Sequence, residues 1–327
     1  MNNLRLSVAM CTYNGAKYLK AQLDSIAAQT RLPDELVVCD DGSEDGSRQI
    51  IKSFAQSAPF PVRLEINETN LGSTKNFEKA IGLCQREIIA LADQDDLWKP
   101  HKLERLCRSL EENPTAGYVF SDAELVDSRG MPTGQGLWGS LRMESALMRE
   151  FRATNQVAFL LRRTVVTGAT MAFRGSLKNA LLPISSHLVH DYWISSIASS
   201  IGAYGIPLSE KLIQYRQHGD QQIGAGGRSI LEKVRSARQA RPTLYTSTVQ
   251  GFQDMRERLL WAAFEGRTGS SRHIGLVEEK IKHCSHRAEA HSAHGTAKVS
   301  KVISEVVTGG YRRYSDSWRS VVRDLCF

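Results

Sequence analysis

Apolar and polar positions alternate along the first hundred residues in a pattern that predicts strands and helices in turn. Four short apolar runs have the length of a buried strand: 4–12, 36–39, 62–66 and 88–92. Three segments between them are predicted to be helices: 16–30, 47–55 and 74–84. Strands that alternate with helices over several units predict an α/β fold, with a mostly parallel, doubly wound sheet flanked by helices.

The pattern continues less regularly to about residue 222. In chain order we expect a helix at 99–112, a strand at 118–122, a loop-rich insertion at 127–150, a strand from 160–166 into 167–173, a helix at 190–201, and short strands at 203–207 and 211–216. Beyond the glycine-rich break at 224–227 the composition shifts to basic helical segments. We therefore expect two domains, an α/β domain at 1–227 and a mainly helical C-terminal extension at 228–327.

Three polar clusters stand at the ends of predicted strands. They are Thr12-Tyr13-Asn14, Asp40-Asp41 and Asp93-Gln94-Asp95-Asp96. Ligands of doubly wound sheets bind beyond the carboxyl ends of the strands, so this shared location predicts a functional site. The third cluster holds three carboxylates within four residues, which raise one another's pKa unless positive charge lies among them. Hard oxygen ligands of this kind suit Mg2+ or Mn2+; the alternative is a solvated acidic turn that caps the helix starting near Pro100.

Composition narrows the class of protein. The 327 residues are 41% hydrophobic and 24% charged, which is ordinary for a globular protein with a sizeable core. No apolar run approaches the roughly 20 residues of a membrane span, and we see no signal-peptide pattern at the start. The six scattered cysteines are expected to be buried thiols in a reducing cytoplasm, not a disulfide framework.

The net charge of +7 is concentrated in the last third of the chain. Residues 228–327 hold 18 Lys and Arg against 10 Asp and Glu, so the remainder is close to neutral. Apolar residues recur there at helical spacing, which predicts helices that pack on the α/β domain or on a second subunit, or that lie on an anionic membrane surface. Nucleic acid is not expected as a partner, because the charge is spread through helices without a recognition motif.

Four histidines of this extension lie beside Cys284 at helical spacings: His283, His286, His291 and His294. They could form a zinc site, yet no second cluster completes one. A solvated polar helix face is therefore the preferred interpretation.

Seven short motifs follow one another along the chain: Cys11–Gly15, Asp40–Ser43, Asn70–Gly72, Asp93–Trp98, Thr167–Ala169, His190-Asp191 and Tyr215–His218. Each is a weak signal alone, but their order is specific. Together they resemble the inverting family 2 glycosyltransferases of the GT-A fold, most of all the bacterial rhamnosyltransferase-like branch that builds O-antigen and other cell-envelope polysaccharides. The resemblance covers about residues 5–222 and implies a Rossmann-like GT-A domain that binds a nucleotide sugar.

The resemblance implies a donor nucleotide site made by Thr12, Tyr13, Asn14, Asp40, Asp41 and Asp93. Within it, Asp40 would accept a hydrogen bond from N3–H of uracil or thymine, so a UDP- or dTDP-sugar is expected. Asp95 and His218 would bind the divalent cation, Mg2+ or Mn2+, that offsets charge on the leaving diphosphate. The alternative for Tyr13 is that its ring packs on the sheet and contacts no ligand. The alternative for His218 is that it is solvated and binds no metal.

Asp191 is the expected catalytic base, because an inverting transfer needs one group to deprotonate the attacking hydroxyl. A carboxylate at a helix N-terminus stays ionised, and a simple helix cap is the alternative interpretation. The pocket for sugar and acceptor is expected to include Asp96, Trp98, Gly168, Ala169, His190 and Trp193. The two tryptophans could equally be core residues.

The predicted function is a metal-dependent inverting glycosyltransferase. It would move a sugar, with rhamnose favoured, from a UDP- or dTDP-sugar to a hydroxyl of a lipid-linked or surface-polysaccharide acceptor. One alternative is a sugar-phosphate nucleotidyltransferase, which would need a glycine-rich phosphate loop that residues 11–15 lack. Another is a non-catalytic nucleotide- or glycan-binding scaffold. We expect a cytoplasmic location, peripheral at the inner face of the membrane through 228–327, and the extension could also join copies into a homo-oligomer.

Overall fold

The computed structural model describes residues 4–143, 145–153, 155–219, 230–267 and 269–326. The chain divides into two compact units. The first unit comprises Met1–Arg152, Val165–Ile184 and Ala203–Gly226, and the second comprises Ala153–Thr164, Ser185–Gly202 and Gly227–Phe327. Two segments that precede residue 203 therefore group with the C-terminal helices.

The first unit is built on one sheet, which has nine strands within the described residues. In chain order they are β1 (Leu6–Thr12), β2 (Glu35–Asp40), β3 (Val62–Ile66), β4 (Ile88–Ala92), β5 (Leu97–Trp98), β6 (Ala116–Val126), β7 (Pro132–Gly136), β8 (Met171–Arg174) and β9 (Tyr204–Arg216). Their order in the sheet is β3-β2-β1-β4-β8-β6-β9-β5, with β7 paired to β6. The pairs among β3, β2, β1 and β4 are parallel, as is β6 with β9, whereas β5, β7 and β8 run antiparallel to their neighbours.

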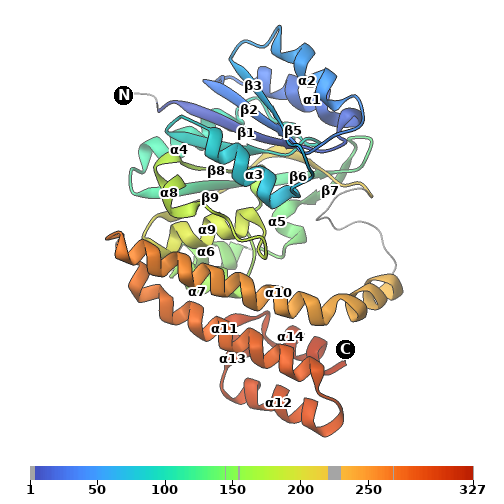
Figure 1. Ribbon diagram of the computed structural model, residues 1–327, viewed down its shortest axis with the longest axis vertical. Helices are drawn as coiled ribbons and strands as arrows, with labels where there is room; N and C mark the ends of the chain where they lie inside the picture. The colour runs from blue at the N-terminus through green and yellow to red at the C-terminus, as the bar shows by residue number, and fades with distance from the viewer. Residues whose placement is uncertain (1–3, 144, 154, 220–229, 268, 327) are drawn as a thin grey trace. The chain divides into compact units, whose positions relative to one another are not determined.

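The predicted fold class is confirmed: a mostly parallel sheet is flanked by helices, and a helical extension follows. β1 and β4 are buried along their whole length, which is why their sequences are continuous apolar runs and not alternating ones. α1 (Ala16–Ala27) and α2 (Ser47–Ala55) follow β1 and β2, and α3 (Ser73–Leu83) leads from β3 to β4. Because crossovers are right-handed and β4 lies beyond β1 from β2, α3 covers the face opposite to that of α1 and α2. Figure 1 shows α3 across β1 and β2, which it contacts.

Three stretches differ from the expectation. Residues 127–150, expected as a loop, contain α5 (Leu137–Ser140), most of α6 (Ser145–Ala153) and β7, because β7 finds a pairing partner in the end of β6. The apolar run at 160–166 begins inside α7 (Gln156–Arg162), a helix that Asn155 caps by accepting from the backbone N–H of Val157. The two short strands expected at 203–216 are one strand, β9, because its pairing with β6 continues across a register shift.

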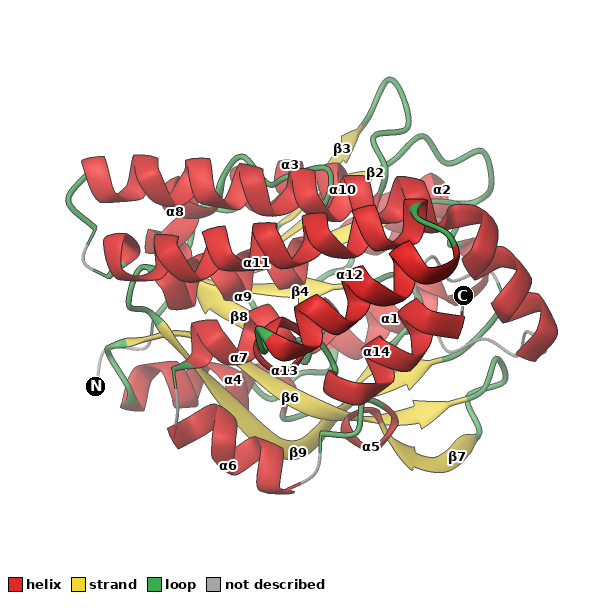
Figure 2. Ribbon diagram, turned by 90° about the horizontal axis from the view of Figure 1, so that it is seen from below, coloured by secondary structure: helices red, strands yellow, loops and turns green. Residues whose placement is uncertain are grey.

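The second unit is helical. Its helices are α7, α9 (His190–Ser200), α10 (Ile230–Phe264), α11 (Ser270–Ser292), α12 (Gly295–Val307), α13 (Gly310–Tyr314) and α14 (Ser317–Cys326). α10 and α11 pack together and lie side by side in Figures 1 and 2. Phe252, Met255 and Leu259 are buried in α10, as their helical spacing predicts. Among the described residues, no helix has the length and apolar content needed to cross a membrane.

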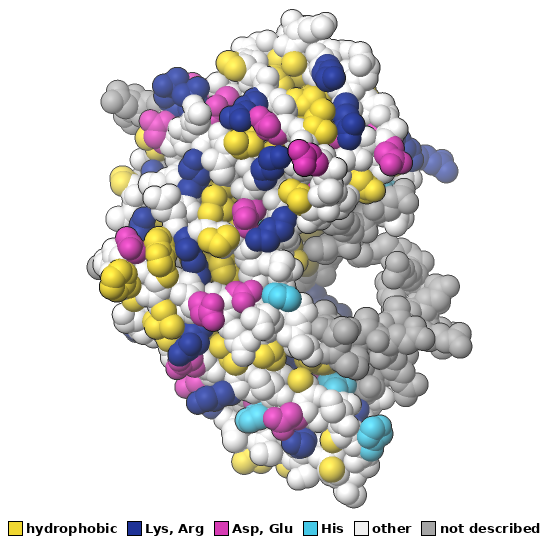
Figure 3. Space-filling view, viewed as in Figure 1, with side chains coloured by type: hydrophobic (Ala, Val, Ile, Leu, Met, Phe, Trp, Pro, Cys, Tyr) yellow, Lys and Arg dark blue, Asp and Glu magenta, His cyan; other side chains and the backbone are white. Residues whose placement is uncertain are grey.

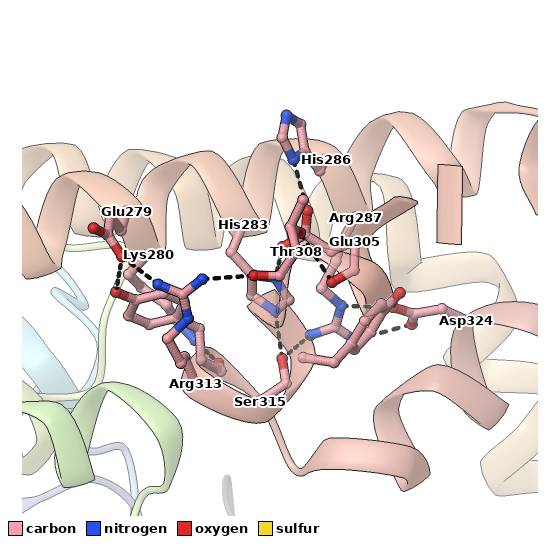
Figure 4. Close-up of polar contacts among 12 residues, drawn as sticks. Glu279, Lys280, His283, His286, Arg287, Glu305, Thr308, Arg313, Ser315 and Asp324 are labelled. Atoms are coloured by element: carbon pink, nitrogen blue, oxygen red, sulfur yellow. Dashed lines mark hydrogen bonds and ion pairs between the residues drawn. The ribbon is translucent and has the colours of Figure 1, made fainter. Parts of the chain in front are cut away.

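Polar side chains form part of the core of this unit (Figure 4). The buried His283 ring has Glu305 Oε1 2.6 Å from its Nδ1 and Ser315 Oγ 2.6 Å from its Nε2. A neutral ring satisfies both partners by donating from Nδ1 and accepting at Nε2. Burial lowers the pKa of His283 to about 4, although the hydrogen bond to Glu305 acts in the opposite direction. The expected solvated face is therefore wrong for His283, because α12 and α13 cover this side of α11, and it is also wrong for His291, whose nearly buried ring contacts Asp324 of α14.

Asp324 of α14 is the second centre of this polar core. Its buried carboxylate accepts hydrogen bonds from Tyr245 Oη at 3.0 Å, Tyr311 Oη at 2.7 Å, Arg287 Nε at 2.6 Å and His291 Nε2 at 3.1 Å. Burial would raise the pKa of Asp324, but the hydrogen bonds from His291 and Arg287 lower it well below its usual range. One carboxylate thereby joins α10, α11, α13 and α14.

We expect the full chain to lose stability as the pH falls from 6.5 to 4. The folded pKa of His283, about 4, lies below its ordinary value of 6.5, so in this window the unfolded chain binds a proton that the folded chain excludes. The loss should reach roughly 3 kcal/mol of unfolding free energy and is measured by thermal melts between pH 7.5 and 4.5. His283→Gln should flatten this dependence, whereas His286→Gln, whose side chain is half exposed, should keep it. Equal slopes for wild type and His283→Gln would contradict the assignment.

Candidate active site

The carboxyl ends of β1 and β4 lie where the strand order of the sheet reverses. The chain leaves β1 through α1 toward β2 on one side, and β4 pairs with β1 on the other side. Loops that diverge at such a point open a crevice, which is where ligands of doubly wound sheets bind. In the strand register, Thr12, the last residue of β1, lies beside Asp40 of β2. Ala92, the last residue of β4, lies beside Met10, which is two residues before the end of β1. The three polar clusters thus share one edge of the sheet, as predicted.

Asp40 ends β2, is fully buried and accepts hydrogen bonds from its own chain. Oδ1 accepts from the Ser43 N–H at 3.0 Å and from Arg48 Nε at 2.8 Å. Oδ2 accepts from Thr12 Oγ1 at 3.0 Å and from Ser43 Oγ at 2.5 Å. Burial would raise the pKa of Asp40, but the hydrogen bonds from Ser43, Arg48 and Thr12 outweigh it and lower the pKa. This ionised carboxylate fixes Thr12 and the turn after β2.

Asp41 turns to the other side of the strand end and holds a different loop. Its Oδ1 accepts from Asn67 Nδ2 at 2.7 Å and from the Leu71 N–H at 2.8 Å. Its Oδ2 accepts from the Gly72 N–H at 2.8 Å. Gly72 has a φ of +78°, a backbone conformation that favours glycine, immediately before α3. Asp41 therefore anchors the loop between β3 and α3.

Gln94 joins the loops that follow β1 and β4. Its Oε1 accepts from the Tyr13 N–H at 2.8 Å, and its Nε2 donates to the Tyr13 carbonyl at 3.0 Å. Gly15 leaves room for it, because a Cβ at this position would overlap the Gln94 amide and force that side chain to move. Asn14 has a φ of +48° and accepts at Oδ1 from the Glu44 N–H at 2.9 Å. The ring of Tyr13 is held on this fixed backbone and is exposed.

The end of β9 binds the carboxylate loop after β4. His218 Nε2 lies 2.8 Å from Asp95 Oδ2, so the predicted metal-binding pair is brought together across 123 residues. The Arg216 N–H donates to Asp96 Oδ1 at 3.0 Å, and Arg216 Nε donates to the Asp95 carbonyl at 2.9 Å. The Tyr18 ring of α1 packs against both, with its centroid 5.0 Å from that of His218 and 4.6 Å from the guanidinium carbon of Arg216.

Asp96 and Lys102 are ionisable side chains buried at this loop. Asp96 Oδ2 has no hydrogen-bond partner among the described residues. Burial raises the pKa of Asp96 well above its usual value, and the charges of Asp95 and Asp93 raise it further. Burial also lowers the pKa of Lys102 well below its usual value. Burial thus favours the neutral form of each side chain, and a neutral Asp96 reduces the repulsion among the three carboxylates.

Lys102 of α4 (Lys102–Glu112) also reaches the segment expected to line the acceptor pocket. Its Nζ donates to the Ala169 carbonyl at 2.7 Å, in the 3-10 turn Gly168–Thr170. The same Nζ lies 3.5 Å from the ring centroid of Trp98. Trp98, Gly168 and Ala169 are buried, so Lys102 ties the carboxylate loop to this turn.

A divalent cation fits between Asp95 and His218. Neighbouring ligands of an octahedral ion, each at about 2.1 Å, stand about 3 Å apart. The 2.8 Å between Asp95 Oδ2 and His218 Nε2 is close to this spacing, and a carboxylate with an imidazole suits Mn2+. Within the described residues no group of three or more His, Cys, Asp or Glu could hold an ion. Two protein ligands leave the other positions to water and to ligand oxygens.

His190, Asp191 and Trp193 belong to the second unit, in the first turns of α9. His190 and Trp193 are buried, and burial lowers the pKa of His190. Asp191 is half-buried, and its Oδ1 accepts from the Tyr192 N–H at 2.6 Å. The roles of these three residues in the site stay predictions.

Sequence reasoning assigned no role to four side chains that shape this site: Tyr18, Arg48, Gln94 and Lys102. A signal existed for Lys102, because it occupies a position four residues before Leu106 on the apolar stripe of its helix. The Arg216 guanidinium donates to the Asp95 carbonyl, while the Arg216 backbone amide contacts the Asp96 carboxylate.

The family model for "Glycosyl transferase family 2" matches residues 7–179. The match takes in β1 to β4 and the loops after them, including the carboxylate loop. The chain belongs to glycosyl transferase family 2. The rhamnosyltransferase branch expected from the motifs is a finer assignment that the family match leaves open.

Curated relatives of this family 2 chain include an uncharacterized glycosyltransferase of Nostoc sp., 34% identical over 124 residues that make up 38% of each chain. Another is the UDP-Glc:alpha-D-GlcNAc-diphosphoundecaprenol beta-1,3-glucosyltransferase WfgD of Escherichia coli, 28% identical over 131 residues, 40% of this chain and 50% of that one. The chain spans about two fifths to three fifths of the length of the first curated relatives it matches.

Solved structures with the same fold include S. aureus TarS 1-349 in complex with UDP-GlcNAc, with a TM-score of 0.59, 17% identity and coverage of 86% of this chain and 72% of that one. The mannosyltransferase PcManGT from Pyrobaculum calidifontis, in complex with GDP-Man and Mn2+, has a TM-score of 0.55 and 19% identity, covering 100% of this chain and 86% of that one. The family 2 chain therefore has the GT-A glycosyltransferase fold.

Gly15→Ala tests the packing of Gln94 across the crevice. We expect a loss of about 1 to 3 kcal/mol of unfolding free energy in denaturant titration, because the new Cβ displaces the amide that bonds Tyr13. Gly46→Ala is the matched control, since its Cβ would meet only Ala16 at an ordinary 3.7 Å. When Gln94 is already replaced by alanine, Gly15→Ala should cause little further loss of unfolding free energy. Full additivity of the two changes would contradict the proposed contact.

Proposed function

We propose that this protein is a metal-dependent inverting glycosyltransferase that moves a sugar from a nucleoside-diphosphate sugar to a hydroxyl group. The observation that carries the proposal is the pairing of Asp95 with His218 at the reversal point of a family 2 domain. Asp95 comes from the loop after β4 and His218 from the segment after β9, so the pair forms only in the folded sheet. A fixed pair of metal ligands beside a nucleotide crevice suits diphosphate binding.

The donor nucleotide is proposed to bind at the carboxyl ends of β1 and β2. The residues assigned to it are Thr12, Tyr13, Asn14, Asp40, Asp41 and Asp93. The exposed Tyr13 ring provides a stacking surface, and Asp40 is an ionised acceptor for a pyrimidine N3–H. Asp40 already accepts four hydrogen bonds from its own chain, so a bound pyrimidine base must take the place of one of these donors. We propose that it replaces Arg48, because the Arg48 side chain is partly exposed.

The donor is proposed to be a UDP- or dTDP-sugar, with rhamnose the sugar that the motif resemblance favours. Pyrimidine use is supported by the UDP-GlcNAc complex of TarS and by the UDP-Glc in the name of the E. coli relative. The mannosyltransferase neighbour is a complex with GDP-Man, so GDP is the purine to test against.

Asp95 and His218 are proposed to hold Mg2+ or Mn2+ together with the donor. When bound, the ion offsets negative charge on the leaving nucleoside diphosphate. Mn2+ accompanies GDP-Man in the mannosyltransferase neighbour, which supports this assignment. The chain's own part is to orient the two ligands: Arg216 fixes the loop at Asp95, and Tyr18 packs on the His218 ring.

Asp191 is proposed to be the catalytic base. In one in-line displacement the acceptor oxygen bonds to the anomeric carbon, the bond to the diphosphate oxygen breaks, and the acceptor proton passes to the carboxylate. It lies in the first turn of α9, near the positive end of the helix dipole. Asp96, Trp98, Gly168, Ala169, His190 and Trp193 are the residues proposed to shape the sugar and acceptor pocket.

The acceptor is proposed to be a lipid-linked or surface-polysaccharide glycan, met at the inner face of the cytoplasmic membrane. The diphosphoundecaprenol in the name of the E. coli relative supports a lipid-linked acceptor. Residues 228–327 are proposed to make the peripheral membrane contact, and a homo-oligomer through them is the competing role. A non-catalytic scaffold and a nucleotidyltransferase are the competing functions.

We expect UDP or dTDP, with Mn2+ present, to raise the melting temperature of the full chain, and GDP, CDP and ADP to leave it unchanged. A hundredfold excess over Kd corresponds to about 2.7 kcal/mol of stabilisation. Asp95→Asn and His218→Ala should remove the metal-dependent part, whereas Asp24→Asn, an exposed carboxylate of α1, should not. A shift with GDP alone would overturn the pyrimidine assignment, and no shift with any nucleotide would overturn the donor site.

Asp191→Asn should lower kcat by about 10²- to 10⁴-fold while the nucleotide Kd stays within about twofold, because the base acts only in the transfer step. The measurement is nucleoside diphosphate release from the donor found above, with diphosphoundecaprenol-linked sugars as acceptors. Glu265→Gln, an exposed carboxyl of the same unit, is the matched control. Full activity of Asp191→Asn would exclude this residue as the base.

A further inference from the structure

Two neighbouring helices of the second unit present apolar side chains to solvent. The exposed residues are Val299, Ile303, Val306 and Val307 on α12, and Trp318, Val322 and Leu325 on α14. We name this set the α12/α14 face. Residues spaced by three and four positions lie on one side of a helix, so each set forms a stripe. Seven exposed apolar side chains within 27 consecutive positions exceed the scattered single residues of an ordinary surface.

The two stripes meet at the contact between the helices. Val302 of α12 is buried in a cluster against which Val321 of α14 packs. On α12, Val299 and Val306 stand three positions before and four positions after Val302, and both belong to the α12/α14 face. On α14, Trp318 and Leu325 stand at the same spacings from Val321 and also belong to it. The exposed stripes of α12 and α14 therefore both lie next to the same buried cluster.

Cations outnumber carboxylates around this face, although Lys301 pairs with Glu289 of α11 at 2.6 Å and Arg313 pairs with Glu279 at 3.3 Å. Residues 295–326 carry Lys298, Lys301, Arg312, Arg313, Arg319 and Arg323. The three carboxylates of the same stretch are withdrawn: Glu305 and Asp324 are buried in the polar core, and Asp316 pairs with Arg163. Within the described part of this stretch, no carboxylate side chain is exposed. Elsewhere the signs mix: in Figure 3, acidic and basic side chains alternate over the surface near α1–α3.

We propose that the α12/α14 face lies on an anionic lipid bilayer. Apolar side chains that include a tryptophan, with more cations than carboxylates beside them, match an amphipathic surface that enters the headgroup region. A second copy of the chain fits less well, because a symmetric contact would set these cations against one another. The inference rests on the proposed function, since it identifies the surface through which the protein meets a membrane carrying a lipid-linked acceptor.

The test is flotation of the full chain with vesicles of phosphatidylcholine containing 30% phosphatidylglycerol, and with pure phosphatidylcholine. Wild type should float with the anionic vesicles only, and 0.5 M salt should weaken its binding. Trp318→Ser with Val322→Ser should lower the partition coefficient at least tenfold. Leu71→Ser with Met131→Ser, two exposed apolar residues of the first unit, should leave it unchanged. Thermal melts confirm that the variants fold.

Charge and insertion are tested separately. Arg312→Gln with Arg323→Gln should lower binding to anionic vesicles at least fivefold, and Lys20→Gln with Lys52→Gln, exposed on the first unit, should not. Five cysteines are buried, as expected from composition, but Cys326 is exposed, so the expectation is wrong for it and an environment-sensitive dye on Cys326 reports on this face. Its emission should shift to the blue when anionic vesicles are added.

The outcomes separate this inference from the proposed function. All binding is measured without nucleotide or acceptor, and Asp95→Asn should float like wild type. No flotation of wild type, or equal flotation of every variant, would overturn the inference. A concentration-dependent dimer in solution that Trp318→Ser with Val322→Ser dissolves, without vesicle binding, would assign the face to a second copy instead.

Discussion

Mutual repulsion among three carboxylates within four residues is the constraint around which the first unit is built. The end of β9 relieves it: Arg216 binds the loop through its backbone amide and guanidinium, and His218 contacts Asp95. Burial favours the neutral form of Asp96, so fewer charges remain to repel one another. These contacts join segments 123 residues apart, so the candidate metal ligands become neighbours only when the sheet is complete. The site is therefore a product of the whole first unit, not of a local motif.

The neighbouring carboxylates Asp40 and Asp41 show how one strand end can serve two loops. Successive side chains of a strand point to opposite sides, so Asp40 faces Thr12 and Arg48 while Asp41 faces the loop before α3. Asp40 accepts four hydrogen bonds and Asp41 three from donors of their own chain, which makes these loops stiff before any ligand arrives. Such preorganisation reduces the ordering cost of binding, whereas Tyr13, exposed on its fixed backbone, is left to contact a ligand.

The sequence was sufficient to predict the strands that carry polar clusters, because a buried parallel strand is a continuous apolar run and ends where the first carboxylate appears. It also paired Asp95 with His218, but only through the resemblance to a family. It could not predict β9 as one strand, because the pairing partner β6 lies about 90 residues earlier. Nor could periodicity show that His283 is buried, since the helices covering α11 follow it in the chain and their packing is a tertiary property. Lys102 was missed because a lysine in an apolar stripe is normally a surface residue.

A cation site with two protein ligands has a consequence for how the proposed enzyme would work. The ion and the diphosphate would complete each other's coordination, so each must raise the affinity of the other by the same factor. Specificity for the donor then depends on the loops held by Asp40, Asp41 and Gln94, and not on the ion. The proposed acceptor is a separate problem, because a lipid-linked glycan would be confined to a surface. A protein held on that surface through the α12/α14 face meets such an acceptor at a high effective concentration without any additional contact to the sugar.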